Sequence, residues 1–208
     1  MKIFKDFGFH GEKALREVLT TSPYGTLEQT VASLALFTHP ETVAQTTSGG
    51  LFRVRRYKAG EKRGQVLPEE KVVLCDNTTP ANVFRWANAV RRGALTEVQF
   101  NHIYPKSQSW ECYTSLANIC VTPAFLSKAT DKSPEVRAIL RYRVFRLYGF
   151  RPSDEPEPTK PPDYDSLSWA PCLPESKDVG ADLRAALNSS PKSRAAVSAR
   201  LFGWHFST

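Results

Sequence analysis

The chain has 208 residues, of which 28 are Lys or Arg and 21 are Asp or Glu, so its formal net charge is +7. Hydrophobic residues make up 41% of the sequence, enough for a buried core, and this excludes a wholly disordered chain. The longest apolar stretches, such as residues 31–37, fall far short of the roughly 20 residues of a membrane-spanning helix. We therefore expect a folded protein that does not span a membrane.

Targeting and redox features indicate the cell interior. The first residues carry a charge every few positions and lack the apolar run of a secretory signal, so we expect a cytoplasmic protein. The four cysteines are Cys75, Cys112, Cys120 and Cys172, and no two of them have the CxxC spacing of a zinc ribbon. We expect four reduced thiols and no disulfide framework.

Positive charge is concentrated in the first 150 residues, which hold 21 basic and 13 acidic side chains, against 7 and 8 in the remainder. A surface of this sign attracts polyanions, and nucleic acid is the commonest large polyanion in a cell. Acidic proteins and membrane surfaces stay open as alternatives on charge alone.

Helices and short strands are both expected in the N-terminal half. In chain order the sequence predicts helices over Gly11–Thr20 and 27–37, a strand with a basic loop over 51–66, a buried strand over 71–75 and a helix over 81–91. Thr26 can cap the second helix, and His39-Pro40 is expected to stop it. Thr79 and Pro80 suit the entry to the last helix. Region 51–66 is either a solvated strand or an arm that follows nucleic-acid phosphates, because basic and aromatic side chains interleave in it.

Residues 96–130 predict two strands and a helix from local chemistry. Val98, Phe100 and His102 alternate with polar residues, as in a strand, and the β-prone run 119–121 can pair with it antiparallel. Thr122-Pro123 then carries a cap and a first-turn signal for a helix over 123–130.

The same stretch resembles the HNH, or ββα-metal, nuclease family. The matching residues are Asn101-His102-Ile103-Tyr104-Pro105-Lys106-Ser107, Ser115-Leu116-Ala117-Asn118 and Ser127-Lys128. HNH nucleases typically carry an acid or amide followed by His-Ile/Val-x-Pro, then a Ser/Asn-Leu-x-Asn element, and a His or Asn about nine residues further on. The sequence is most similar to the nuclease module of RNA-guided DNA-cutting enzymes, over residues 97–134.

The resemblance implies roles in phosphodiester cleavage, which needs an activated water and charge stabilisation at the phosphate. His102 would be the general base, and Asn118 would fasten the loop that holds it. Asn101 would be the first ligand of one divalent cation, Mg²⁺ or Mn²⁺, and Ser127 stands at the position of the second ligand. Both are neutral where the family more often has Asp and His or Asn, so we expect weak metal binding. Asp131, one helical turn after Ser127, would supply the missing negative charge.

A helix is predicted over Pro134–Tyr148, because Ser133 can cap it, Pro134 suits its first turn and Gly149 ends it. Its four arginines form a second basic surface beside the nuclease-like motif, which favours nucleic-acid binding. The side chains predicted to contact nucleic acid are Arg53, Arg55, Arg56, Lys58, Lys106, Lys128, Arg137 and Arg141.

The C-terminal quarter differs in composition. Seven prolines and six acidic residues within 151–175 predict an extended linker or a loosely packed wrap. Helices are expected over 179–187 and 194–202. The aromatic end of the chain, 201–206, predicts docking on the body or on a protein partner.

We therefore expect an α+β protein with a ββα-metal core at 96–132 in a mostly helical chain. The predicted parts are an N-terminal α/β region at 1–95 that is a candidate for DNA binding, the nuclease core with the basic helix at 96–150, the linker at 151–175 and a helical tail at 176–208. The expected function is metal-dependent hydrolysis of phosphodiester bonds in DNA, in restriction, anti-phage defence or a mobile element. Two alternatives are a catalytically degenerate nucleic-acid-binding subunit and an interaction module of a toxin or defence complex.

Overall fold

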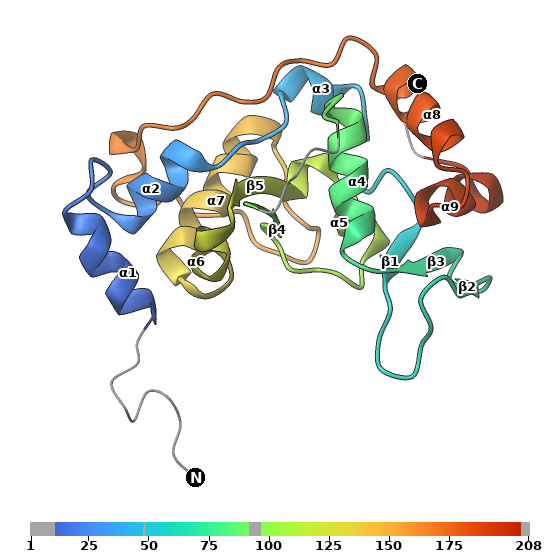
Figure 1. Ribbon diagram of the computed structural model, residues 1–208, viewed down its shortest axis with the longest axis horizontal. Coiled ribbons are helices and arrows are strands. Elements are labelled where there is room, and N and C mark those ends of the chain that lie inside the picture. Colours follow the sequence, from blue (N-terminus) through green and yellow to red (C-terminus); the bar gives the residue numbers. More distant parts are fainter. Residues whose placement is uncertain (1–10, 48, 92–96, 205–208) are drawn as a thin grey trace.

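The computed structural model describes residues 11–47, 49–91 and 97–204. The chain is a mixed α+β protein in which helices predominate and the strands are short, as predicted (Figure 1). Its helices and strands are, in chain order, α1 (Gly11–Thr20), α2 (Leu27–Leu34), α3 (Pro40–Ala44), β1 (Val54–Arg56), β2 (Val66–Leu67), β3 (Val72–Cys75), α4 (Thr78–Ala87), β4 (Val98–His102), α5 (Trp110–Tyr113), β5 (Ile119–Pro123), α6 (Ser127–Lys132), α7 (Pro134–Tyr148), α8 (Val179–Ser189) and α9 (Arg194–Phe202). Within the described ranges, no helix combines the length and the apolar surface that crossing a bilayer requires.

The second helix is shorter than its apolar pattern predicts. The hydroxyl of Thr26 accepts a hydrogen bond from the Gln29 amide and caps α2, as expected. The helix ends at Leu34, because the next residues turn extended and Leu36 exchanges backbone hydrogen bonds with Val121. His39 does not stop this helix. It caps the new helix α3, accepting a hydrogen bond on Nδ1 from the amide two residues later.

Strands β1, β2 and β3 form a small sheet in the order β1-β3-β2, with β1 parallel and β2 antiparallel to β3. All four residues of β3 are buried, which confirms the buried strand predicted at 71–75. The loop between β1 and β2 extends away from the body (Figure 1). Helix α4 follows this sheet and lies earlier in the chain than the predicted 81–91.

Strands β4 and β5 pair antiparallel along their whole length, with Val98 opposite Pro123 and His102 opposite Ile119. This confirms the pairing that the sequence predicts. The following helix begins with a tight 3₁₀ turn at Ala124–Leu126 and continues as α6, which packs against β4 and α7. A strand–strand–helix unit therefore spans residues 98–132.

The boundaries of α7 agree with the prediction at both ends. The hydroxyl of Ser133 accepts a hydrogen bond from the Val136 amide, and Pro134 occupies the first turn. Gly149 ends the helix with a φ of 65°, a left-handed conformation that glycine adopts without steric cost.

Residues 151–175 lie along the body as extended chain and pass α2 on the way to α8 (orange in Figure 1). Ala170 and Leu173 donate their amides to the carbonyls of Ala32 and Phe37, so the wrap is fastened to the body by backbone hydrogen bonds. At the end of the chain Trp204 stacks on Phe52, with ring centroids 6.2 Å apart, and docks on the body as predicted. The last predicted docking residues, 205 and 206, lie outside the described ranges.

Candidate functional site

His102 lies at the end of β4, and the loop that follows the strand holds its ring. Nε2 lies 2.9 Å from the backbone carbonyl oxygen of Tyr113, and the two aromatic rings stack with centroids 5.2 Å apart. A carbonyl oxygen only accepts hydrogen bonds, so Nε2 carries the hydrogen of the neutral ring. Nδ1 is then the unprotonated nitrogen, and it has no hydrogen-bond partner among the described residues.

The surroundings of this ring favour its neutral form. His102 is partly buried, and burial lowers its pKa below the usual value of 6.5, although the hydrogen bond to the Tyr113 carbonyl opposes this shift. The ring is therefore uncharged at physiological pH, with a lone pair on Nδ1 that can take a proton.

Asn118 fastens the loop that carries Tyr113. Its side chain is completely buried, and Oδ1 accepts a hydrogen bond of 2.8 Å from the Tyr104 amide. Nδ2 donates to the carbonyls of Tyr104 and Cys112, both at 3.0 Å. One carboxamide thus joins the start of the loop to the residue just before Tyr113, which is the arrangement that the sequence resemblance implies for Asn118.

Asn101 points to the other face of β4, because neighbouring residues of a strand alternate in direction. Its side chain is buried, and Nδ2 donates to the Thr122 hydroxyl at 2.9 Å and to the Gln99 carbonyl at 3.2 Å. Oδ1 accepts a hydrogen bond of 3.0 Å from the Thr130 hydroxyl on α6. Both amide hydrogens are therefore used, and the oxygen keeps one lone pair free.

The proposed metal ligands form a weak donor set. Ser127 is partly buried at the start of α6, and Asp131 is exposed on the same helix. In the described part of the chain no three His, Cys, Asp or Glu side chains come together in a group that could hold a metal ion. An amide oxygen, a hydroxyl and one carboxylate suit a hard cation such as Mg²⁺, but they supply a single negative charge. The residues present therefore fit only a loosely held cation that takes further oxygens from water and substrate.

The structure corrects the prediction that Arg55 contacts nucleic acid. Its side chain is only 4% exposed, and its guanidinium binds Glu61 at 2.7 Å and Glu70 at 2.8 Å. A further hydrogen bond of 3.1 Å goes to the side chain of Gln108. The hydrogen bonds to Glu61 and Glu70 raise the pKa of Arg55, and the bond from Arg55 lowers the pKa of Glu61 to about 2, so both groups stay charged at neutral pH. Its role is to fix the base of the loop between β1 and β2.

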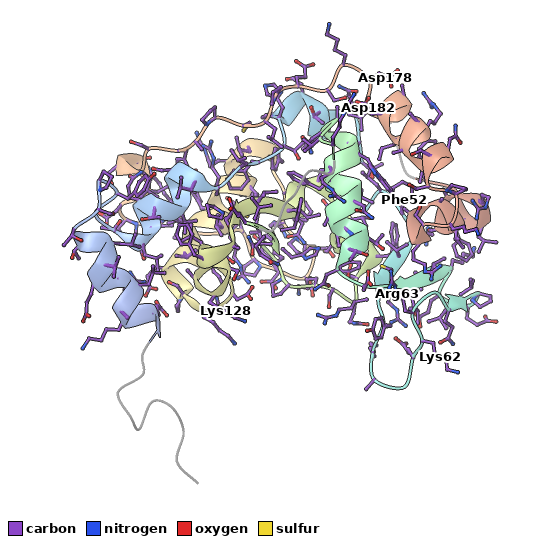
Figure 2. The ribbon with its side chains drawn as sticks, in the orientation of Figure 1. Phe52, Lys62, Arg63, Lys128, Asp178 and Asp182 are labelled. Atoms are coloured by element: carbon purple, nitrogen blue, oxygen red, sulfur yellow. The ribbon has the colours of Figure 1, made fainter. Side chains whose placement is uncertain are left out.

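The other predicted contacts on β1 and α6 lie on different parts of the surface. Arg56 and Lys58 are exposed at the start of the loop between β1 and β2, while Arg53 stacks over the Trp110 ring at 4.3 Å. Lys62 and Arg63 belong to this loop, and Figure 2 shows Lys128 well away from them, under α6. These cations therefore do not form one patch.

Lys106 and Arg141 are occupied by acidic side chains of the segment that follows α7. Lys106 Nζ lies 2.7 Å from Asp154 and 2.9 Å from Glu155. Arg141 lies 3.8 Å from Glu155 and stacks over the ring of Tyr104 at 4.7 Å. Arg137, one turn before Arg141 on α7, is partly buried.

Several residues of the site were not predicted from the sequence. Tyr113 acts through its backbone carbonyl, which any residue type carries, so no sequence signal marks it. Thr130 is one turn after Ser127, and its hydroxyl is the group that meets Asn101. The sequence marks residues 151–175 as acidic, but nothing in it pairs Asp154 and Glu155 with Lys106.

Comparison with known proteins gives no family assignment. No family model matches the chain, and neither a curated protein nor a solved structure matches it.

Proposed function

We propose that the protein is an HNH-type endonuclease that hydrolyses phosphodiester bonds in DNA. The observation that carries the proposal is the hydrogen bond of 2.9 Å from His102 Nε2 to the Tyr113 carbonyl, in a loop fastened by Asn118. This loop connects β4 to β5, and α6 follows, in the order that the sequence resemblance implies for a ββα nuclease.

His102 has the properties that a general base requires. The Tyr113 carbonyl fixes the tautomer and orients the ring, and Nδ1 is left to take a proton from a water molecule. That water attacks the phosphorus atom, and the bond to the departing oxygen breaks. The carbonyl of Tyr113 then also stabilises the protonated ring, because its hydrogen bond strengthens when the imidazole becomes positively charged.

A divalent cation held by Asn101, with Ser127 and Asp131 of α6 as the further proposed ligands, would neutralise charge on the phosphate. The protein's own contribution to holding DNA comes from exposed cations, among them Arg56, Lys58 and Lys128. Such side chains contact the phosphate backbone and position the duplex without reading its sequence.

The test is cleavage of supercoiled plasmid by the purified full chain in Mg²⁺ or Mn²⁺. The His102→Ala variant should lose at least about 100-fold in rate, the usual contribution of a general base, while it still binds DNA. The matched control is His39→Asn, which replaces another partly buried histidine by a residue that can also cap α3. Equal cleavage by wild type and His102→Ala would refute the assignment.

A second candidate function is a nucleic-acid-binding subunit without catalysis. The specific observation in its favour is that the Asn101 carboxamide is already hydrogen-bonded to Thr122 and Thr130, with a single carboxylate, Asp131, in the proposed ligand set. Intact plasmid at every concentration of either metal, together with retained DNA binding, would favour this function over hydrolysis.

A further inference from the structure

Residues 151–158, here called the acidic strap, lie against two cations, one in the loop between β4 and β5 and one on α7. Asp154 and Glu155 both bind Lys106, at 2.7 and 2.9 Å, and the second carboxylate oxygen of Glu155 faces Arg141 at 3.8 Å. Lys106 belongs to the loop that starts directly after His102, and Arg141 belongs to α7. One short segment thus neutralises cations from two separate elements.

The strap is held loosely at this point. Asp154 is 68% exposed, and its contact with Lys106 is an ion pair at the surface, where water and salt screen the attraction. The remaining hydrogen bonds lie within the strap itself, from Arg151 to the Glu155 carbonyl and from the Glu155 amide to the Pro152 carbonyl. A competing polyanion can therefore displace the two carboxylates without unfolding the body.

Two hydrogen-bond donors without partners lie beside the strap. A cavity of about 390 Å³ lies between α7 and the strap and is lined by Tyr104, Arg137, Arg141 and Glu155. Tyr104 is 1% exposed, yet its hydroxyl and the Nε of Arg141 have no hydrogen-bond partner within the described ranges. Unsatisfied donors that are buried beside cations favour an anionic ligand.

We propose that Asp154 and Glu155 stand in for phosphates of a DNA backbone on Lys106 and Arg141, and that the strap leaves when DNA binds. Phosphate and carboxylate oxygens satisfy ammonium and guanidinium donors in the same way, so one can replace the other. A duplex brings many phosphates at once and gains from the release of counterions, which favours it over the two carboxylates of the strap. The proposal rests on the proposed function, because it assigns DNA as the ligand, and it adds that the protein restrains its own DNA binding.

The experiment compares two double variants with the same change in charge. Asp154→Asn with Glu155→Gln removes the strap carboxylates. Asp163→Asn with Glu175→Gln removes two exposed acidic groups of the same C-terminal segment that form no ion pair among the described residues. Affinity for a fluorescently labelled DNA duplex is measured by anisotropy in the presence of EDTA, which prevents cleavage, for wild type and both variants. A parallel titration uses inorganic phosphate alone.

The strap variant should bind the duplex about five to ten times more tightly than the control variant, as expected for the loss of two or three surface ion pairs. Addition of Lys106→Gln should reduce this difference, because Lys106 forms two of the three ion pairs with the strap and Arg141 forms the third. Equal affinities of the two double variants, or a gain that Lys106→Gln leaves undiminished, would overturn the proposal, and so would inorganic phosphate that binds as tightly as DNA.

The same data separate this proposal from the proposed function. Plasmid cleavage by the wild type with no difference between the double variants would leave the nuclease assignment intact and refute the strap. A strap effect on binding without cleavage would support the strap and favour the binding subunit. Failure of every variant to bind DNA would refute both.

Discussion

Gly50 packs directly against the backbone carbonyl of Trp110, so closely that a Cβ at Gly50 would lie 1.9 Å from that oxygen. Trp110 begins α5, the short helix that ends at Tyr113 and so carries the carbonyl that orients His102. The close approach of two backbones therefore supports the position of the candidate base. Only glycine, which has no Cβ, allows the two backbones to come this close.

Replacement of Gly50 by Ala should destabilise the protein by about 3 kcal/mol, because the backbone of α5 has to move to admit the methyl group. The measurement is urea unfolding of the purified chain. The matched control is Gly49→Ala, whose Cβ would meet its nearest atom, the Glu111 carbonyl oxygen, at an ordinary 3.7 Å. Equal effects of the two substitutions would contradict the close approach.

Asn118→Ala should lower the free energy of unfolding by about 2–4 kcal/mol and also reduce cleavage. The substitution leaves the amide and carbonyl of Tyr104 and the carbonyl of Cys112 without their buried partner. Denaturant unfolding gives the stability, and plasmid cleavage gives the rate. Asn188→Ala, on the exposed face of α8, is the control and should change stability by less than about 0.5 kcal/mol.

Arg55 and Arg56 are neighbours with opposite expected effects. Arg55→Met should lower the free energy of unfolding clearly more than Arg56→Met does, because it removes the buried cation that Glu61 and Glu70 share and loosens the loop after β1. Arg56→Met should leave stability almost unchanged and weaken DNA binding, since Arg56 is exposed. The two variants are compared by urea unfolding and by anisotropy at several salt concentrations. A stability loss shared equally by both would contradict the assignment of Arg55 to the interior.

The pKa of His102 predicts how stability depends on pH. Burial lowers this pKa below 6.5, so between the folded and the unfolded value the unfolded chain binds more protons, and the free energy of unfolding rises with pH. The loss of stability caused by protonation of His102 is complete below the pKa of the folded state and disappears above about pH 6.5, the pKa of the unfolded chain. His102→Gln removes this contribution and should flatten the dependence of stability on pH below about pH 6.5. Cleavage of plasmid by the wild type should also persist below pH 6.5, because the base stays unprotonated there. If the pH dependence of stability is the same in His102→Gln as in the wild type, the lowered pKa is refuted.

Asn101→Asp tests whether the strand face opposite His102 binds a cation. An added carboxylate should reduce the Mg²⁺ concentration needed for half-maximal cleavage roughly tenfold, because a negative oxygen attracts the cation where the amide does not. The measurement is cleavage across a Mg²⁺ titration, with circular dichroism to verify folding. Asp131→Asn should shift the requirement in the opposite direction. If both variants need the same Mg²⁺ concentration as the wild type, neither residue binds the metal.

Helix α7 and the β4–β5 pair could be predicted from the sequence because their signals are local. Ser133, Pro134 and Gly149 act within a turn of the helix ends that they define, and the alternation around His102 marks a strand regardless of what surrounds it. The sequence predicts helix α2 too long, because its end is set by a contact with a distant part of the chain. Its last residues are apolar at helical spacing, but backbone pairing of Leu36 with Val121 draws them into extended structure.

The sequence alone determined which residues are candidates for the proposed chemistry, namely a histidine, two asparagines and an excess of cations. The tertiary structure decided how each one is used. Arg55 and Lys106 are both basic, yet one is buried between Glu61 and Glu70 and the other is covered by Asp154 and Glu155. Which acidic side chain pairs with which cation depends on how the chain folds back on itself. The carbonyl that orients His102 belongs to the backbone, which is the same in every residue, so the sequence does not mark it.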